Sequence, residues 1–413
     1  MISIFSAVRA ASRRLPLLTD AERSAAILAL ADLVDANHTL LLEANAADLA
    51  RMDPANPLYD RLQLTDARLD AIASDLRHVA ALPCPLGEVM EERTLPNGIL
   101  LRRVRVPFGV IGVIYEARPN VTFDVFALCL KSGNACILKG GKDASASNEA
   151  AIGLIHRALA ETGIDPDVAV LLPSTHEATA ALLNAVGYVD LCIPRGGRKL
   201  IDFVRDTARV PVIETGAGVV HAYFDRDGSL EIGKLVVDNA KTRRVSVCNA
   251  LDTLLVHRDR LGDLPELCHV LGEKGVEIHA DPRALAALDG AYPAHLLVAA
   301  SETDPEREWM DMKMGLYTVD DIDGAIAHID RYGSGHSETI VSESPEAQSL
   351  FTGRVDAACV YVNLPTSFTD GGQFGLGAEI GISTQKLGPR GPMGLREITT
   401  YRYILTGHGQ VRN

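Results

Sequence analysis

Residues 109–141 read GVIGVIYEARPNVTFDVFALCLKSGNACILKGG, and this stretch decides the fold. It holds a short apolar run (109–115), a segment with helical spacing (124–132) and a second apolar run (134–140). Both runs are apolar throughout instead of alternating, which is typical of strands that are buried on both faces of a sheet. The strand–helix–strand order therefore predicts a parallel, doubly wound sheet.

The same alternation continues to residue 215. We predict further strands at 168–173, 189–194 and 210–216, and further helices at 146–163, 176–186 and 197–206. A second α/β pattern follows from about residue 217 to 385. Residues 1–80 have helical spacing, and Thr19 followed by Glu22 is the sequence signature of a capping box at a helix start.

A small β unit is predicted outside these two patterns. Asn97-Gly98 lies between two extended runs in residues 93–106, which is a strong hairpin signal. The second arm of the hairpin, ILLRRVRV (99–106), offers a long edge that should be covered, for instance by a partner subunit. The tail at 398–413 also alternates, and we expect it to form another edge strand.

Composition limits the function. The formal net charge is −14, from 40 Lys plus Arg and 54 Asp plus Glu, which disfavours non-specific binding to nucleic acid or anionic lipid. No apolar run approaches the ~20 residues of a spanning helix. The seven widely spaced cysteines, without a CxxC pair, predict a reducing cytoplasm and no zinc site. No histidine pair has convincing ligand spacing, so we predict no metal.

The Arg-containing N-terminus resembles a transit peptide, but its composition also fits an opening amphipathic helix, which we favour.

Two glycine corners follow predicted strands and precede helices. One is Lys139-Gly140-Gly141, and the other is Gly196-Gly197 between basic residues. Such corners let backbone N–H groups approach a phosphate, and the cations add charge. Neither matches GxGxxG or the Walker pattern, so each corner could equally be a plain surface turn.

Cys248 has the most basic neighbourhood of the seven cysteines, with Lys241, Arg243 and Arg244 shortly before it. Nearby cations stabilise a thiolate, which is the condition for a nucleophilic cysteine. The alternative is a buried, inert thiol. Glu214 ends a predicted strand beside glycines, where a carboxylate acts as a base, positions a cofactor or is simply solvated.

These features recur together in one superfamily. Glu214-Thr-Gly-Ala-Gly, followed 34 residues later by Cys248, and Lys139 after Ser132-Gly133-Asn134 resemble the aldehyde dehydrogenases. Within that superfamily, longer stretches resemble the gamma-glutamyl phosphate reductases and span most of residues 100–407. They are VIYEARPNVTFD, SGNACILKGG, DNAKTRRVSVCNALDTLLVH, RYGSGHSETIV and FGLGAEIGISTQKLGPRGPMGLREITTYRYI.

The resemblance implies an α/β, aldehyde-dehydrogenase-like fold: a Rossmann-type cofactor domain, an α/β catalytic domain and a small β oligomerisation element. We expect the NADPH-binding domain at 1–92 and 107–215 and the catalytic domain at 216–385. The oligomerisation element would comprise the hairpin at 93–106 and the tail strand at 398–413.

The implied activity is NADPH-dependent reduction of L-glutamyl 5-phosphate to L-glutamate 5-semialdehyde and phosphate, a step of proline biosynthesis. Cys248 would carry the acyl group as a thioester. The resemblance matches Lys139 to the cofactor lysine of the superfamily. Together with the corner chemistry, this leads us to expect cofactor binding at both corners, namely by Lys139, Gly140, Gly141, Lys142, Gly196 and Gly197. From the hairpin and the tail we expect a homo-oligomer, and we also expect channelling of the substrate from glutamate 5-kinase.

Two positions depart from the superfamily pattern. The position of the oxyanion asparagine falls on Glu116, so Asn120 or the backbone N–H of Cys248 would serve as the donor. Lys142 stands where NAD-using relatives often carry a glutamate, and a cation there favours the 2′-phosphate of NADP. The role of Glu214 stays open, because a reductase needs no activated water. Two competing hypotheses are an ordinary aldehyde dehydrogenase that oxidises aldehydes to acids, and a catalytically silent nucleotide-binding protein.

Overall fold

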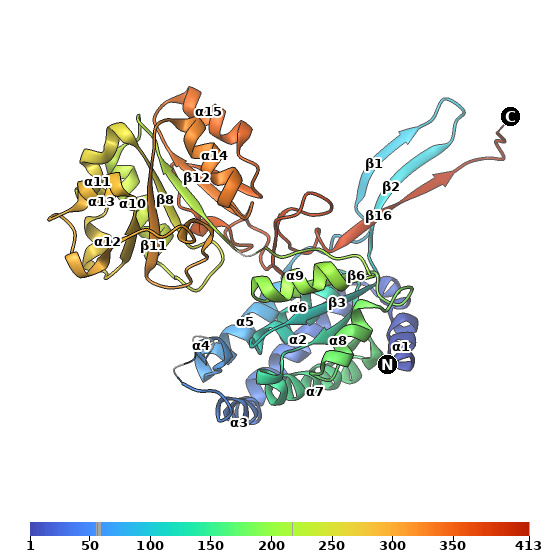
Figure 1. Cartoon of the computed structure of the whole chain (residues 1–413). Coiled ribbons are helices and arrows are strands. Elements are labelled where there is room, and N and C mark those ends of the chain that lie inside the picture. Colours follow the sequence, from blue (N-terminus) through green and yellow to red (C-terminus); the bar gives the residue numbers. More distant parts are fainter. Residues whose placement is uncertain (55, 57–58, 217, 413) are drawn as a thin grey trace. The chain divides into compact units, whose positions relative to one another are not determined.

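The computed structural model describes residues 1–54, 56, 59–216 and 218–412 and divides the chain into two compact units (Figure 1). Unit 1 comprises Met1–Glu214, Gly375–Gly381 and Met393–Asn413, and unit 2 comprises Thr215–Phe374 and Ile382–Pro392. Ala217 of the Glu214–Gly218 motif and Asn413 at the end of the predicted tail strand lie outside the described residues.

Unit 1 is built from helices around a four-stranded sheet. Its helices are α1 (Ile2–Ser12), α2 (Asp20–Ala36), α3 (His38–Leu49), α4 (Tyr59–Leu62), α5 (Asp66–Ala81), α6 (Asn120–Lys131), α7 (Ser145–Glu161), α8 (His176–Leu183) and α9 (Arg198–Thr207). Its strands are β1 (Val89–Thr94), β2 (Leu100–Pro107), β3 (Val110–Tyr115), β4 (Ala135–Lys139), β5 (Ala169–Leu171), β6 (Leu191–Arg195) and β16 (Thr399–Thr406).

The predicted parallel sheet is confirmed, with strand order β5-β4-β3-β6. All six residues of β3 are buried, as the unbroken apolar run predicted. Helices lie on both faces of the sheet, and α2 packs against α5, α6 and α7 (Figure 1). The strand predicted at 210–216 is wrong: these residues form only two isolated bridges, Val212 with Cys192 and Thr215 with Ser383. Pro211 has no N–H to continue a ladder, which limits the pairing here.

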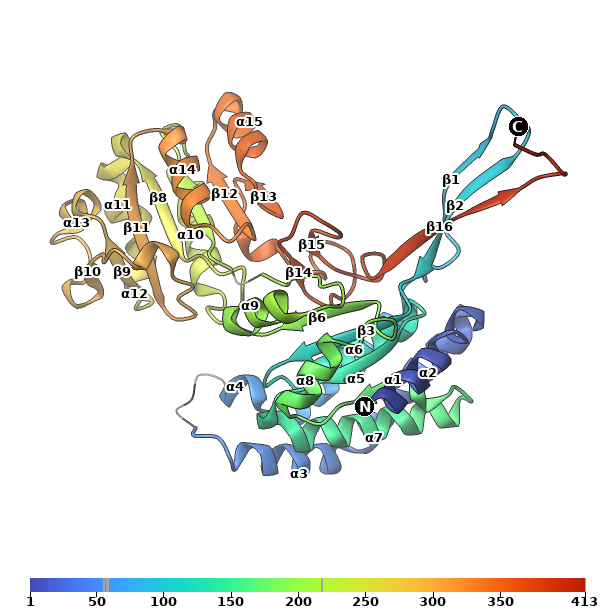
Figure 2. The same cartoon turned by 45° about the vertical axis from the view of Figure 1, so that its right-hand side comes forward.

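The local signals near the N-terminus and in the hairpin are confirmed. The backbone N–H of Glu22 donates to the Thr19 hydroxyl, and the Glu22 carboxylate accepts from the Thr19 N–H, which makes a complete capping box. Strands β1 and β2 form the antiparallel hairpin. The edge of β2 is covered by β16 of the same chain and not by a partner subunit, because the tail pairs with it along eight residues. Figure 2 shows these three strands side by side.

Unit 2 contains a seven-stranded parallel sheet of order β10-β9-β11-β8-β7-β12-β13. The strands are β7 (His221–Phe224), β8 (Thr253–His257), β9 (Glu277–Ala280), β10 (Leu297–Ala299), β11 (Lys313–Val319), β12 (Ser337–Val341) and β13 (Cys359–Val362). The helices are α10 (Leu230–Thr242), α11 (Leu264–Leu267), α12 (His269–Glu273), α13 (Pro282–Leu288), α14 (Ile322–Tyr332) and α15 (Pro345–Arg354). The short strands β14 (Ile382–Ser383) and β15 (Gly391–Pro392) pair with each other.

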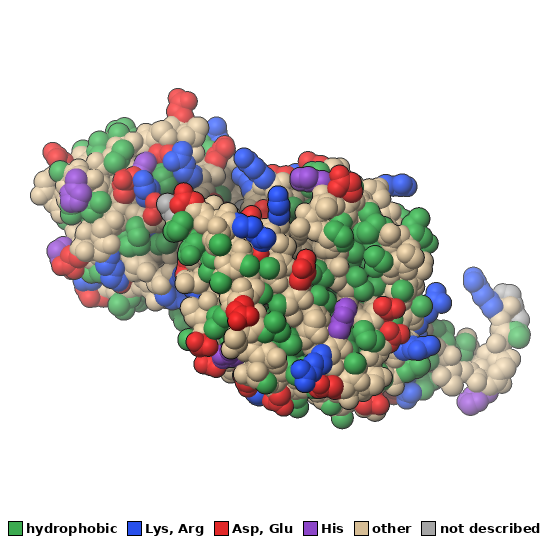
Figure 3. Space-filling model, turned by 90° about the horizontal axis from the view of Figure 1, so that it is seen from below, with side chains coloured by type: hydrophobic (Ala, Val, Ile, Leu, Met, Phe, Trp, Pro, Cys, Tyr) green, Lys and Arg blue, Asp and Glu red, His purple; other side chains and the backbone are tan. Residues whose placement is uncertain are grey.

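The sheet of unit 2 has an apolar core on each face. Residues of α10, α11 and α13 form one core with one face, and residues of α14 and α15 form the other core with the opposite face. Among the described residues no single helix is long and apolar enough to cross a membrane, although the bent pair α2 and α3 together has the necessary length and composition. On the face of the protein in Figure 3, acidic and basic side chains are interspersed.

Candidate functional site

Both glycine corners lie at the carboxyl edge of the sheet in unit 1. Lys139 ends β4 and pairs with Ile114 of β3, while Arg195 ends β6 and pairs with Tyr115, the last residue of β3. The chain runs from β3 to β4 and β5 in one direction and then returns to place β6 on the other side of β3. This reversal is a topological switch point, where open α/β sheets bind ligands beyond their carboxyl ends.

The first corner has little room for side chains. A Cβ atom on Gly140 would collide with the amide of Asn148 and lie 3.3 Å from the Tyr115 ring, so only glycine fits there. Lys139 is half-buried, and burial lowers the pKa of its ammonium group. Lys142 is exposed and begins a short 3-10 helix. At this corner the Gly140 backbone therefore lies close to Asn148 and Tyr115, and two lysines are beside it.

The second corner carries an acidic group that sequence reasoning did not place there. The backbone N–H of Gly197, which precedes α9, donates to the Glu116 carboxylate at 3.0 Å. A Cβ atom on Gly196 would lie 2.7 Å from that carboxyl group. One of the N–H donors expected to face an anion is therefore already held by Glu116. Cofactor binding at Gly196 and Gly197 stays a prediction.

Asn120, the side chain considered as an oxyanion donor, begins α6 and is exposed. Its amide nitrogen donates to the carboxylate of Asp124 at 2.9 Å. Burial, followed by repulsion from Asp75, raises the pKa of Asp124 to about 7. Glu214 is the last residue of the first segment of unit 1, and its carboxylate lies 3.7 Å from Arg205. Asn120 and Glu214 thus both belong to unit 1, whereas Cys248 belongs to unit 2.

Cys248 lies on the loop between α10 and β8, and its side chain is partly exposed. The loop is anchored directly after it, at Asn249. The Asn249 amide donates to the carbonyl of Thr369 at 2.9 Å, and the Thr366 hydroxyl donates to the carbonyl of Asn249 at 2.8 Å. A Cβ atom on Gly218 would overlap the carbonyl group of Cys248, so the two backbones touch.

The other cysteines differ from Cys248 in their surroundings. None of the seven cysteines, all within the described part of the chain, forms a disulfide, and only Cys84 and Cys248 are partly exposed. Burial raises the pKa of the Cys192 and Cys268 thiols to about 12, which keeps them protonated at neutral pH. Cys248 therefore differs from the buried thiols in being partly exposed, and it lies on an anchored loop.

The basic neighbourhood of Cys248 is only partly as predicted. Arg243 and Arg244 are exposed, but Lys241 is 1% exposed and does not form a surface cation beside the thiol. Its ammonium group donates to the carbonyl of Leu251 at 3.1 Å. Burial lowers the pKa of Lys241 to about 8, and the nearby carboxylate of Asp252 opposes that shift. Lys241 therefore supports the end of the loop from inside the unit.

Four residues that sequence reasoning missed hold the segment facing Cys248. The consecutive backbone N–H groups of residues 218–221 donate, in order, to side chains of Glu308 (3.3 Å), Ser334 (2.9 Å), Asp252 (3.3 Å) and Glu338 (2.8 Å). Only Glu338 left a signal in the sequence, as a carboxylate inside a short segment that ends in the apolar pair Ile340-Val341. The other three acceptors lie in loops or at strand ends, where polar residues are ordinary.

One group of potential metal ligands occurs among the described residues, formed by Asp35, His38 and Asp70. Both carboxylates are exposed, and the His38 ring is hydrogen-bonded to Asp66 at 2.9 Å. Exposed acidic groups of this kind are common in proteins without metal, so the group by itself identifies no centre.

Comparisons with known proteins decide the family. No family model matches the chain. A gamma-glutamyl phosphate reductase from Pelodictyon phaeoclathratiforme is 58% identical over 406 residues, which cover 98% of this chain and 97% of that protein. The chain belongs to the gamma-glutamyl phosphate reductase family.

Solved structures agree with this membership. The crystal structure of a gamma-glutamyl phosphate reductase from Thermotoga maritima superposes with a TM-score of 0.95 at 40% identity, covering 100% of this chain and 99% of that one. An acetylating aldehyde dehydrogenase from Geobacillus thermoglucosidasius, at 16% identity, has a TM-score of 0.70 and covers 100% of this chain and 97% of its own. The predicted aldehyde-dehydrogenase-like α/β fold is thereby confirmed, and this family member is an oxidoreductase.

Proposed function

We propose that this gamma-glutamyl phosphate reductase family member reduces L-glutamyl 5-phosphate to L-glutamate 5-semialdehyde and phosphate with NADPH, in proline biosynthesis. The observation that carries the proposal is the partly exposed thiol of Cys248 on a loop that is anchored at the next residue, Asn249. The names of relatives at 58% identity supply the substrate.

The Cys248 thiolate attacks the acyl carbon of the substrate. A C–S bond forms, the C–O bond to the phosphate breaks, and phosphate leaves with the bonding electron pair. When bound, NADPH would supply a hydride to the acyl carbon of the resulting thioester. The acyl oxygen then carries the negative charge of a thiohemiacetal oxyanion. As this oxygen re-forms the C=O bond, the C–S bond breaks, the Cys248 sulfur leaves as a thiolate, and the semialdehyde is released.

The residues at the first glycine corner fit a phosphate-bearing nucleotide. Gly140 lets the chain turn tightly against Asn148 and Tyr115, and Lys139 and Lys142 supply positive charge beside it. The switch point between β3 and β6 places the corner where such ligands bind in related architectures. Lys142 would pair with the 2′-phosphate, which favours NADPH over NADH.

The acyl oxygen gains negative charge during both halves of the reaction and needs hydrogen-bond donors. The backbone N–H of Cys248 is one proposed donor. Asn120 is the other, which requires its amide to exchange the Asp124 carboxylate for the substrate oxygen. Glu214 is proposed to act near the reacting group. It would not activate water, because the thioester is reduced by hydride and is not hydrolysed.

An assay in the oxidative direction tests the proposal. With L-glutamate 5-semialdehyde and NADP, we expect reduction of NADP only when phosphate or its analogue arsenate is present, because the thioester must be attacked by that anion. Reduction of NADP with release of free glutamate in the absence of phosphate would identify an ordinary aldehyde dehydrogenase instead. No turnover with any acyl phosphate or aldehyde would leave a silent nucleotide-binding protein.

We also propose that the protein is a homo-oligomer that works in the cytoplasm and receives its substrate from glutamate 5-kinase. The three-stranded sheet of β1, β2 and β16 supports the oligomer, since Val89, Tyr403 and Leu405 are exposed on it. A reducing compartment keeps the Cys248 thiol available. Sedimentation of wild type and Leu405→Glu tests the oligomer, which the added charge should weaken; an unchanged sedimentation coefficient would contradict this interface.

A further inference from the structure

The segment between Gly218 and His221 determines where the backbone of Cys248 lies. Gly218 is buried, and its Cα is so close to the carbonyl of Cys248 that a Cβ atom would overlap it. A shift of this segment toward or away from Cys248 must therefore move the loop that carries the thiol. The segment precedes or only just enters β7, so few ladder hydrogen bonds hold it.

On one side of residues 218–221, hydrogen bonds to side chains take the place of hydrogen bonds to a neighbouring strand. Four consecutive N–H groups donate to four different side chains, and the acceptors come from separate parts of unit 2. On the other side, the carbonyl of Val220 accepts from the N–H groups of Asp252 and Thr253, both at 3.0 Å. A side-chain acceptor can hold the backbone of residues 218–221 in place only if that side chain is itself held by its neighbours.

Glu338 is the most deeply buried of the four acceptors. It is fully buried on β12, and β12 pairs with β7 so that Glu338 lies opposite His221. One carboxylate oxygen accepts from the His221 backbone N–H at 2.8 Å and lies 3.0 Å from Nδ1 of the His221 ring. Burial raises the pKa of Glu338, and the contacts with His221 oppose that shift. The other carboxylate oxygen is buried without a hydrogen-bond partner in the described part of the chain, so the contacts with His221 are the ones that offset the cost of burying this carboxyl group.

The residue before Glu338 reaches the other side of Cys248. The Ser337 hydroxyl lies 2.6 Å from the hydroxyl of Thr369, and the carbonyl of Thr369 holds the Asn249 amide. Both Ser337 and Thr369 are almost fully buried. The start of β12 is therefore linked to the backbone at Cys248 by two routes: Glu338 acts through residues 218–221, and Ser337 acts through Thr369 and Asn249.

We propose that Glu338, paired with His221, is a positioning residue that sets the Cys248 thiol for attack, acting through the backbone of residues 218–221. The proposal rests on the function proposed above, in which Cys248 is the nucleophile. It predicts that losing the acceptor at residue 338 misplaces the thiol while leaving the binding of substrate and cofactor intact.

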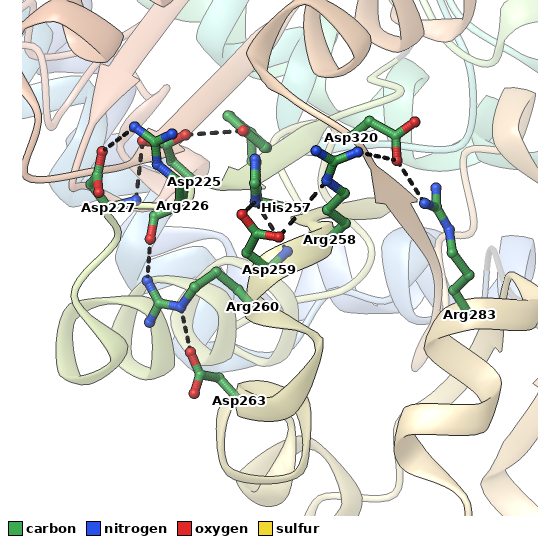
Figure 4. Close-up of polar contacts among 11 residues, drawn as sticks. Asp225, Arg226, Asp227, His257, Arg258, Asp259, Arg260, Asp263, Arg283 and Asp320 are labelled. Carbon is green, nitrogen blue, oxygen red and sulfur yellow. Dashed lines mark hydrogen bonds and ion pairs between the residues drawn. The ribbon is translucent and has the colours of Figure 1, made fainter.

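The experiment compares Glu338→Ala with Glu338→Gln and with a matched control, Asp225→Ala. Asp225 is a buried carboxylate at the opposite ends of the same strands, where it accepts from the Ser342 hydroxyl at 2.6 Å and the Tyr223 hydroxyl at 3.0 Å. Figure 4 shows Asp225 in a polar network with residues that follow β7 and β8, whereas Cys248 precedes β8 in the chain. Asp225→Ala removes a comparable buried acceptor but leaves the hydrogen bonds of residues 218–221 in place.

For Glu338→Ala we expect kcat to fall by about tenfold to a hundredfold with KM nearly unchanged, because a displacement of about 1 Å costs on that order. Alkylation of Cys248 by iodoacetamide, followed on its own peptide by mass spectrometry to separate it from Cys84, should change in rate. Glu338→Gln keeps an oxygen acceptor for the His221 N–H and should restore most of kcat. Asp225→Ala should lower thermal stability but not kcat or the alkylation rate.

Alkylation reports on the thiol even if the proposed reaction is wrong, so the two proposals fail separately. Glu338→Ala with wild-type kcat and alkylation rate would overturn the positioning role, as would equal losses of kcat in Glu338→Ala and Asp225→Ala. If Glu338→Ala does not fold, Ser334→Ala decides the matter, because it removes the acceptor of the Val219 N–H from a partly exposed loop. A several-fold lower kcat supports the proposal, and an unchanged kcat refutes it.

Discussion

Replacing Gly218 by alanine tests whether the touching backbones of Gly218 and Cys248 matter for catalysis. The added methyl would lie 2.6 Å from the carbonyl carbon of Cys248 and closer still to its oxygen. Restoring an ordinary contact of about 3.5 Å requires the carbonyl carbon of Cys248 to move by about 1 Å and its oxygen by about 2 Å. We therefore expect kcat to fall about a hundredfold, since a reacting atom misplaced by about 1 Å costs roughly that much. Overpacking should also cost about 1–3 kcal/mol of stability.

The matched control is Gly353→Ala, the same substitution in the same unit. Gly353 lies within α15, and a Cβ atom there meets nothing within 4 Å. It should leave kcat unchanged and stabilise the helix by about 0.5–1 kcal/mol. Steady-state kinetics and thermal unfolding of both variants give the comparison. Wild-type kcat in Gly218→Ala, or equal kinetic losses in both variants, would refute the reasoning.

Three further predictions concern unit 1. Lys142→Ala should raise KM for NADPH about tenfold and leave KM for NADH unchanged, because one charge-assisted contact to the 2′-phosphate is lost; equal effects on both cofactors would count against this role. Burial raises the pKa of Asp124 to about 7, above its unfolded value, so the folded protein loses stability as pH rises from about 4 to about 7. Asp124→Asn should therefore show a smaller fall of Tm between about pH 5 and about pH 8 than wild type, and an identical fall would be inconsistent with that shift. Thr19→Ala removes the hydroxyl that accepts from Glu22 and should cost about 1 kcal/mol in urea unfolding, whereas no change would show that the cap does not stabilise α2.

Features that depend on neighbouring residues could be predicted from the sequence. The capping box at Thr19, the hairpin at Asn97-Gly98 and the buried strand β3 each follow from a few consecutive residues. The glycine corner at Lys139 was recognised in the same way, because strand, glycines and helix follow one another. Such signals act over a single turn or strand, so the rest of the fold changes them little.

Features that depend on distant residues could not be predicted. The edge of β2 pairs with β16, which lies about 300 residues later in the chain. The sequence of neither strand indicates that the other is its partner. Lys241 precedes Cys248 closely, yet the packing of α10 turns it inward to the carbonyl of Leu251. Glu116 at the second corner and Glu338 beside His221 are likewise long-range contacts. The sequence indicated the candidate nucleophile, but not the side chains that hold it.

The most direct test of the account is to look for an acyl group on Cys248. L-Glutamyl 5-phosphate, generated in place from L-glutamate and ATP by a glutamate 5-kinase, is mixed with the enzyme without NADPH. Peptide mass spectrometry should then find a glutamyl adduct on the Cys248 peptide, together with release of about one phosphate per enzyme. The adduct should disappear when NADPH is added and be absent in Cys248→Ala. Full turnover by the wild type without an adduct on Cys248, or by Cys248→Ala, would contradict the account.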